Sequence, residues 1–335
     1  MSVKTFIVWL TVTMILAFSV ITLGAYTRLT HAGLGCPDWP GCYGQWLAPS
    51  SSAQITQIQT EYPDQQIDGG KAWTEMVHRY AAGGLGLLII GLTGFSLIYR
   101  RRENLPIGVP LVLVGLIIWQ ALLGMWTVTL KLHPLIVMAH LLGGLTIFAG
   151  LAGWRAQLVQ LAHPITDYFF SSRTCRWVGL GLLLLIGQIA LGGWVSANYA
   201  GIACLGFPTC NGHWWPMWHW QAFDIFMPLG MNYEGGLLGP AERVSIQMAH
   251  RIGAFLVVGY WGVLAIYLLI QSPPPRIRTP LILLMLLLVA QFVIGMINVL
   301  ALLPLSAATA HNGVAALILV TAVNLYLQVR SASNR

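Results

Sequence analysis

The chain consists of long apolar stretches separated by polar connections. Each stretch has about 20 residues, enough for a helix to cross a bilayer. Two connections, roughly 27–75 and 198–246, are long and show no helical period, yet they contain seven of the 14 Trp residues. Trp-rich loops are not typical of disorder, so we expect both to pack, for example as lids at the membrane surface. The apolar stretches cover residues 6–26, 76–99, 107–128, 135–154, 177–197, 247–270, 280–300 and 306–328.

The pattern predicts an all-α membrane protein with eight transmembrane helices, and the composition agrees. Charged residues make up 8% of the chain, against about 25% in soluble domains, and the mean hydropathy is +0.72. An ordinary soluble globule is therefore excluded. A net charge of +7 would suggest nucleic acid as a partner, but the basic residues are scattered between the spans rather than gathered in one stripe. We expect membrane lipid as a partner and no nucleic acid.

The basic residues also predict the orientation of the helices. With the N-terminus in the cytoplasm, 11 of the 17 Lys and Arg residues lie on the cytoplasmic side, as the positive-inside rule requires. Both termini are then cytoplasmic, and both long loops lie outside. The first span follows Lys4 but lacks a cleavage site near its end, so we interpret it as a membrane helix rather than a signal peptide. No Arg-rich transit sequence precedes it, which favours the inner membrane of a bacterium.

Matching motifs recur in the two halves of the chain at nearly equal spacing. A Gly, two Cys in C-x5-C spacing and an M-x-H-R string follow one another in the same order. Each half has four spans, an even number, so both halves enter the membrane in the same sense. We predict two four-helix bundles, 1–160 and 161–335, related by a pseudo-twofold axis along the membrane normal. The motifs are Gly24, Cys36, Cys42 and 76–79 in the first half, and Gly192, Cys204, Cys210 and 248–251 in the second.

Four of the nine His residues lie within apolar spans, at matching places in the two halves. An imidazole is costly in a membrane and usually marks a site there, and four repeat-matched imidazoles are poorly explained by interhelical hydrogen bonds alone. Two facing imidazoles from two helices of a bundle are what bis-histidine haem ligation requires. Two His per bundle are too few for a closed zinc or copper site. The four are His78 and His140 in the first half, and His250 and His311 in the second.

Residues beside these histidines suit a flat macrocycle. The small residues 81–84 and 143–144 would let a porphyrin approach its helices closely, although they also favour close helix packing. Arg79 and Arg251 directly follow the first histidine of each half. Together with Arg28, they are candidates for contacts with haem propionates. Snorkelling to the membrane interface is the alternative for these arginines.

The cysteines of the long loops predict two disulfides, because each loop has one C-x5-C pair and faces an oxidising compartment. We favour a structural role for these bonds over a redox role. A metal cluster of the second pair with His213 and His219 is disfavoured, since the first loop has no counterpart. Cys175 stands alone on the cytoplasmic side, where we expect a reduced thiol. The predicted pairs are Cys36–Cys42 and Cys204–Cys210.

One carboxylate breaks the symmetry of the two halves. Glu75 stands three residues before His78 on the same helical face, whereas Gln247 stands three residues before His250. A carboxylate beside a bound macrocycle can accept a proton or stabilise a developing cation, and an amide does neither well. The first half is therefore the candidate for catalysis and the second for a permanent electron-transfer haem. The alternative is that Glu75 only complements the dipole at a helix N-terminus.

These motifs together resemble the haem A synthase family, in its cysteine-containing bacterial branch, over nearly the whole chain. The resemblance implies an oxidoreductase that oxidises the C8 methyl group of haem O to the formyl group of haem A. The steps would be successive hydroxylations and loss of water from a geminal diol, and terminal oxidases would use the product. The motifs are the string GAYTRLTHAGLGCPDWPGCYG from Gly24 to Gly44, E-x-x-H at Glu75 and His78, the partner His140, H-R at His250, and H-N-G at His311.

The resemblance also implies roles for individual residues. His78 and His140 would hold the substrate haem O, with Glu75 assisting the oxidation. His250 and His311 would ligate a haem b cofactor. Haem O synthase and assembly factors of terminal oxidases are the implied protein partners, and in this branch the disulfide of the first loop sits close to the substrate site.

Two other functions fit parts of the pattern. A dihaem b-type cytochrome that only relays electrons would use the same four histidines. A parallel-repeat transporter would show the same symmetry without any cofactor. Glu75 discriminates between the synthase and the relay, because only the synthase needs a carboxylate beside one haem.

Overall fold

A computed structural model describes residues 3–63, 66–103, 105–162 and 169–333. This part of the chain is helical and contains no extended strand. Eight of its helices are long and apolar enough to cross a membrane, which confirms the predicted fold class of a multi-pass all-α membrane protein. The elements are α1 (Val3–Leu29), α2 (Ser52–Glu61), α3 (Gly69–Glu103), α4 (Gly108–Thr129), α5 (Pro134–Ala162), α6 (Ser172–Ala197), η1 (Trp220–Phe223), α7 (Pro240–Ile270), α8 (Pro275–Leu300) and α9 (Leu305–Ser333).

Every predicted span is confirmed, and each helix extends past its apolar stretch at one end or both, although α4 begins one residue later than predicted. The largest extension at an N-terminus is in α3 and α7, which each start seven residues before the predicted 76 and 247. Polar residues at the membrane interface continue the backbone hydrogen bonds of a helix, so hydropathy marks the apolar centre of a span rather than its ends. As a result, Glu75 and His78 lie inside α3 and not at its start.

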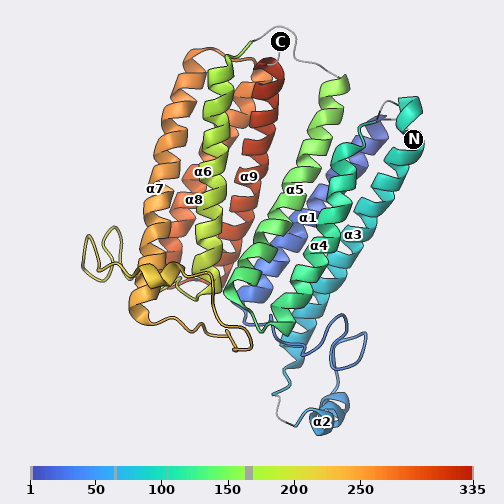
Figure 1. The fold of residues 1–335 in the computed structure, drawn as a ribbon, viewed down its shortest axis with the longest axis vertical. Helices are drawn as coiled ribbons and strands as arrows, with labels where there is room; N and C mark the ends of the chain where they lie inside the picture. Colours follow the sequence, from blue (N-terminus) through green and yellow to red (C-terminus); the bar gives the residue numbers. More distant parts are fainter. Residues whose placement is uncertain (1–2, 64–65, 104, 163–168, 334–335) are drawn as a thin grey trace.

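The eight long helices form two neighbouring groups. Within the first, α1 packs on α3 and α5, and α4 packs on α3 and α5; within the second, α6 packs on α7 and α9, and α8 packs on α7 and α9. The groups meet where α1 and α5 contact α9 and where α5 contacts α6. Figure 1 shows that the chain termini lie at one end of the bundle and the two long loops at the other. We call these loops the first loop (30–68) and the second loop (198–239).

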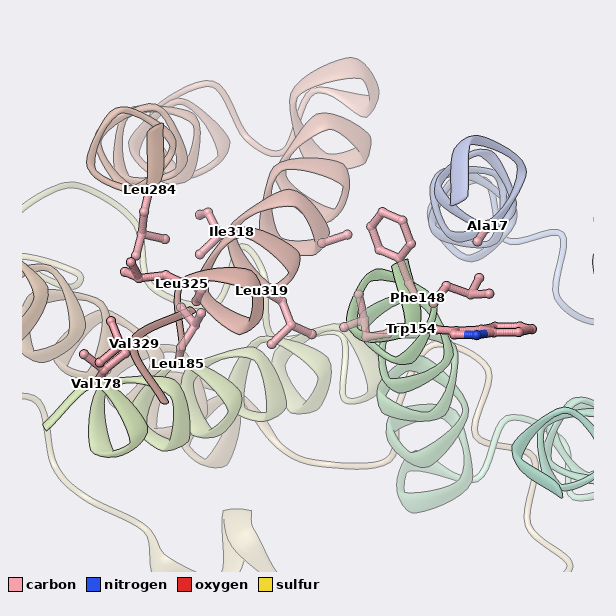
Figure 2. Packing of buried hydrophobic residues seen from close by; sticks show 14 of the residues in the cluster. Ala17, Phe148, Trp154, Val178, Leu185, Leu284, Ile318, Leu319, Leu325 and Val329 are labelled. Carbon is pink, nitrogen blue, oxygen red and sulfur yellow. The ribbon is translucent and has the colours of Figure 1, made fainter. Parts of the chain in front are cut away.

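Both groups contribute to one hydrophobic core. A single cluster of buried side chains includes Phe148 and Trp154 of α5, Ala17 of α1 and Leu319 of α9. Figure 2 shows these residues between the helices, with Leu319 directed toward α5. Lipid tails are as apolar as these side chains, so van der Waals packing, rather than removal of apolar surface from water, stabilises the contact within a membrane. The core therefore fixes the two groups against each other.

The four helices that run toward the loop end of the bundle, α1, α4, α6 and α8, all terminate in the same way. In each helix, a backbone N–H just beyond the end donates to the carbonyl five residues earlier, which lies two residues before the last helical residue. The pairs are Ala32 to Thr27, Leu132 to Thr127, Ala200 to Val195 and Leu303 to Asn298, at 2.7 to 2.9 Å. A residue with positive φ stands just before each donor. This is the hydrogen-bond pattern of a Schellman motif. The fold thus contains four helical hairpins with the same turn, two of which carry a long loop.

The long loops are packed, as predicted, but the first contains a helix that the hydrophobic pattern did not reveal. In α2, Ser51 and Gln54 form a capping box, and Ile58 is buried against Tyr43 and Met76 in a small core of the first loop. The sequence S-x-x-Q before this helix is the signal that identifies it. The short helix has only one buried residue, which is why hydrophobic period did not predict it.

The second loop lies across the other group of helices. The N–H of Tyr233 donates to the carbonyl of Lys131 at 3.0 Å, and His133 Nε2 lies 3.2 Å from the carbonyl of Met227. Lys131 and His133 belong to the turn between α4 and α5. A loop of the second half therefore covers the end of the first half, in line with the predicted lid.

Candidate functional site

The four intramembrane histidines form two facing pairs. His78 of α3 faces His140 of α5, with ring centres 6.5 Å apart, and His250 of α7 faces His311 of α9, with ring centres 6.4 Å apart. Their ring planes are inclined by 81° and 76°. In each group, the two helices without a histidine pair member lie between the two helices that carry one. Each pair thus spans the interior of a four-helix group.

These distances fit one metal ion between each pair of imidazoles. Two metal–nitrogen bonds of about 2 Å on opposite sides of one ion place the ring centres roughly 6 Å apart. A pair of axial imidazoles leaves the plane between them for a porphyrin. Within the described residues, no group of three or more His, Cys, Asp or Glu side chains is placed to hold a metal ion without a macrocycle. The geometry therefore suits two bis-histidine haems.

A glycine on the preceding helix lies against each imidazole. An added Cβ would come 2.9 to 3.3 Å from the Cε1 atom of the ring in all four hairpins, closer than normal packing allows. These close contacts restrict the position of each ring, and a side chain in place of the glycine would require the ring to shift. The sequence repeat marks Gly24 and Gly192 but does not reveal their contact with the histidines. The pairs are Gly24 with His78, Gly124 with His140, Gly192 with His250, and Gly295 with His311.

A glutamine one turn before this glycine supports three of the four histidine helices. Its amide nitrogen donates to the backbone carbonyl of the histidine, at 2.7 Å from Gln120, 2.9 Å from Gln188 and 3.0 Å from Gln291. In the hairpin of His78, the corresponding residue is Val20. Sequence reasoning missed Gln188, although it shares the Q-x3-G spacing with the other two. The hairpin of His78 therefore differs from the other three.

Glu75 is buried beside His78, in contact with the disulfide loop. Only 4% of its surface is exposed. Its Oε2 accepts a hydrogen bond from the backbone N–H of Cys36 at 2.9 Å, and its Oε1 pairs with Arg79 at 2.5 Å. It is the seventh residue of α3, and the first turn of that helix has no acidic residue. The alternative that Glu75 only complements a helix dipole is therefore wrong.

The corresponding amide has a different environment. Gln247 is equally buried, with 5% of its surface exposed, but its Oε1 has no hydrogen-bond partner in the described part of the chain. Arg251 donates instead to the carbonyl of Cys204 at 2.5 Å. The asymmetry predicted between Glu75 and Gln247 thus extends to the hydrogen bonds around them.

The arginines beside the histidines hold the long loops. Arg79 donates to the carbonyls of Asp38, Pro40 and Gly41 at 2.5 to 3.2 Å. Arg251 donates to those of Gly206 and Thr209, as well as Cys204. Propionates or the membrane interface were the expected partners of Arg79 and Arg251, and the structure shows loop carbonyls instead. Each arginine fastens the loop of its own half to the helix that carries the first histidine.

The third predicted arginine lies where the halves meet. Arg28 donates to the carbonyl of Ser196 at 2.7 Å and stacks on the ring of Tyr199, 4.0 Å from its centre. These contacts join the end of α1 to the end of α6. Propionate contacts for Arg28, Arg79 and Arg251 stay predictions.

Both predicted disulfides are present. Cys36 pairs with Cys42 and Cys204 with Cys210, each with Cα atoms 4.8 Å apart, and Cys175 is free. All four paired cysteines are fully buried. Because Cys204 and Cys210 are bonded to each other, they have no thiolates to offer to His213 and His219. Near the first pair, burial and the charges of Glu75 and Asp38 raise the pKa of the Tyr43 phenol, which therefore stays protonated at neutral pH.

Comparison with known proteins gives a consistent result. Residues 7–323 match the family model described as cytochrome oxidase assembly protein. A haem A synthase of Shewanella oneidensis is 40% identical over 97% of each chain. Haem A synthases of Beijerinckia indica, 29% identical over 94% of this chain and 90% of the relative, and of Neorickettsia sennetsu, 28% identical over 96% and 98%, are also similar. The chain therefore belongs to the haem A synthase family of cytochrome oxidase assembly proteins.

Proposed function

We propose that this chain is a haem A synthase, an oxidoreductase that converts the C8 methyl group of haem O into the formyl group of haem A for terminal oxidases. The observation that carries this proposal is two equivalent pairs of facing imidazoles, only one of which has a buried carboxylate beside it. The family supports it, since the relatives are named haem A synthase. Haem is thus both substrate and cofactor.

The two halves divide this work. In the first, 1–160, His78 and His140 hold the iron of haem O. In the second, 161–335, His250 and His311 hold the iron of a haem b that transfers electrons. The iron porphyrins supply the redox chemistry, and the protein supplies ligation, orientation and a controlled polarity.

Glu75 acts on protons beside the substrate. Its carboxylate is held by the Cys36 N–H and the Arg79 guanidinium and stands one helical turn from His78. From there it accepts a proton released during oxidation or stabilises a cation that develops on the substrate. Gln247 cannot do the same in the second half, which leaves that half with electron transfer only.

The two disulfides are structural in this proposal. Each closes a short ring that is fastened by an arginine to its helix, and the chain-entropy model assigns such a ring roughly 2 kcal/mol of stabilisation. The Cys36–Cys42 bond also orients the N–H that binds Glu75. Mass-spectrometric mapping of both bonds, and haem conversion after their selective reduction, separate a structural role from a redox role.

The proposed location is the inner membrane of a bacterium, with both termini in the cytoplasm and both long loops on the outer side. The distribution of 11 basic residues inside and 6 outside supports this orientation. Haem O arrives through membrane lipid, from haem O synthase, and assembly factors of terminal oxidases receive the product. Cysteine labelling of single positions in intact cells tests the sidedness.

Replacement of Glu75 by Gln tests the function. We expect Glu75→Gln to keep both haem sites but to lower the conversion of haem O by about 100-fold or more, the usual contribution of a general acid or base. Glu61→Gln makes the same change at the exposed end of α2 and should leave conversion unchanged. The measurement is acid-acetone extraction of the purified proteins and chromatographic separation of their haems.

The same extraction discriminates the other functions. Haem B together with haem O, haem A or a hydroxylated intermediate supports the synthase. Haem B alone in the wild type supports an electron relay, and a protein without haem supports a transporter. An unchanged yield of haem A in Glu75→Gln would contradict the role of the carboxylate.

A further inference from the structure

Three aromatic rings close the seam between α7 and α8. Phe207 of the second loop lies 6.2 Å from Phe255 of α7 and 6.1 Å from Phe292 of α8, measured between ring centres. The rings of Phe255 and Phe292 are 5.3 Å apart. Aromatic pairs at such distances attract one another beyond the effect of their buried area. The loop thus places one ring over the line where two helices meet.

The corresponding seam between α3 and α4 has no such cover. The internal repeat matches Phe255 to Gly83 and Phe292 to Ala121, counted from His250 and His78 and from Gln291 and Gln120. Both small residues are exposed on the surface of the described structure. A Cβ added at Gly83 would meet nothing within 4 Å.

The loop residue at this place differs as well. Trp39 is the counterpart of Phe207 in the C-x5-C rings, and 40% of its surface is exposed. Neither helix offers Trp39 the partner rings that Phe207 has. The aromatic cover of the second half therefore lacks a counterpart at three matched positions, one on each helix and one in the loop.

This uncovered seam borders the candidate substrate site. Gly83 is five residues after His78 on α3, and Ala121 is three residues before Gly124, which touches the ring of His140. The ring centres of His78 and His140 are spaced for an iron ion between them. The missing aromatic cover and the facing imidazoles are independent features that point to the same flat ligand.

We propose that the seam between α3 and α4 is the lateral entrance through which haem O passes from the lipid to His78 and His140, and through which haem A leaves. The closed seam between α7 and α8 retains the haem b of the second half. This inference rests on the proposed function. It follows from a difference in what the two sites must do, because a substrate is exchanged in every turnover and a resident cofactor is not.

Closing the entrance is the first test. The double substitution Gly83→Phe with Ala121→Phe installs the pair of rings that the second half has. We expect uptake of haem O from vesicles by the purified protein to slow by about tenfold or more, while its haem b content stays unchanged. Gly91→Phe with Gly115→Phe is the matched control, since both glycines are exposed on the same helices and a Cβ there meets nothing within 4 Å.

Opening the other seam is the second test. Phe255→Ala with Phe292→Ala should speed the transfer of haem b to a soluble haem acceptor such as apomyoglobin by about tenfold. If the closed variant takes up haem O as fast as its control, or the opened variant releases haem b no faster than the wild type, the entrance is refuted while the synthase function stands. A wild-type protein that binds haem at neither pair would instead refute the proposed function.

Discussion

At the scale of single residues, the environment of two arginines explains how charge is tolerated near the membrane. An unpaired buried guanidinium is costly, and hydrogen bonds to carbonyl groups offset that cost. Arg79 has loop carbonyls and Glu75 as acceptors. Arg251 is 7% exposed, and its acceptors in the described part of the chain are carbonyl groups. The disulfide ring of the second loop is therefore held by these carbonyl contacts without the ion pair that the first loop has.

Removal of this arginine should loosen the second loop. We expect Arg251→Met to lower the stability of the folded state by about 2 kcal/mol, because hydrogen bonds to a charged group are lost and buried carbonyls are left without donors. The Cys204–Cys210 bond should then be reduced faster by a small thiol. Arg251→Lys keeps the charge but lacks the planar fork, so an intermediate effect is expected.

Thermal unfolding in detergent and mass-spectrometric counting of free thiols measure both effects. Arg278→Met removes an exposed arginine at the other end of the molecule and serves as the control. Equal reduction rates in Arg251→Met and in this control would show that Arg251 does not hold the loop.

At the scale of elements, the helical hairpin is the unit that builds each half-site. Its first helix ends in a Schellman turn and places a glycine against the histidine of its second helix. The glycine lets the two helices approach closely, and the glutamine before it fixes the histidine backbone in three hairpins. The hairpin that lacks this glutamine is the one that carries Glu75. Under the proposed function, His78 holds a haem that must be exchanged, and fewer constraints on its helix suit that role.

A methyl group at one of these glycines should displace an imidazole. In Gly192→Ala, the new Cβ would lie 3.0 Å from Cε1 of His250, so the ring must shift by a few tenths of an ångström. Changes of this kind beside a metal ligand weaken metal binding by about 10- to 100-fold. Gly187→Ala changes the same helix where a Cβ meets nothing within 4 Å. The haem b content, measured by absorbance and by extraction, should therefore be lower in Gly192→Ala than in Gly187→Ala. Equal contents would refute the role of Gly192.

Much of this element plan follows from the sequence, and the reasons for the exceptions are physical. The eight spans and the histidine pairs were predictable because a membrane tolerates few polar residues, so each imidazole in an apolar run stands out. The ends of helices, such as the N-terminus of α3, were not predictable, because polar residues at the membrane interface do not follow the hydrophobic pattern. The partners of Arg79 and Gln188 also escaped prediction, because a hydrogen bond between distant segments depends on how the helices pack. For α2, a capping box was visible at Ser51, but its single buried residue, Ile58, gives no period.

At the scale of the whole molecule, the two halves are joined at several levels. The hydrophobic core runs through both, and glycines let the helices of different halves approach closely. Gly193 of α6 packs on Leu141 of α5, next to His140, and Gly313 of α9 packs on Thr22 of α1. Each of these glycines lies within two residues of a residue that touches or forms a histidine pair. The two histidine pairs are therefore held at a fixed separation.

The second loop joins the halves at the loop end, and Tyr233 is its main anchor. Its side chain is 1% exposed, its hydroxyl donates to the carbonyl of Pro228 at 2.5 Å, and its ring packs against His133, with ring centres 5.1 Å apart. Loss of a buried aromatic side chain of this size costs about 3 to 5 kcal/mol in a core. A loop is less stable than a core and opens locally before the rest of the structure. The effect should thus be confined to the second loop.

We therefore expect Tyr233→Ala to detach the second loop from the turn between α4 and α5 while the helices stay folded. Limited proteolysis in detergent should cut within residues 198–239 about tenfold faster, because cleavage follows the population of the locally open state. Phe226→Ala removes an aromatic residue of the same loop that is 87% exposed, and its cleavage rate should match the wild type. Since the loop covers the end of α5 that leads to His140, the Tyr233 variant should also lose haem from the first half faster than from the second. Equal cleavage of the two variants would show that the loop is held by other contacts, and equal haem loss from both halves would show that it does not protect the first site.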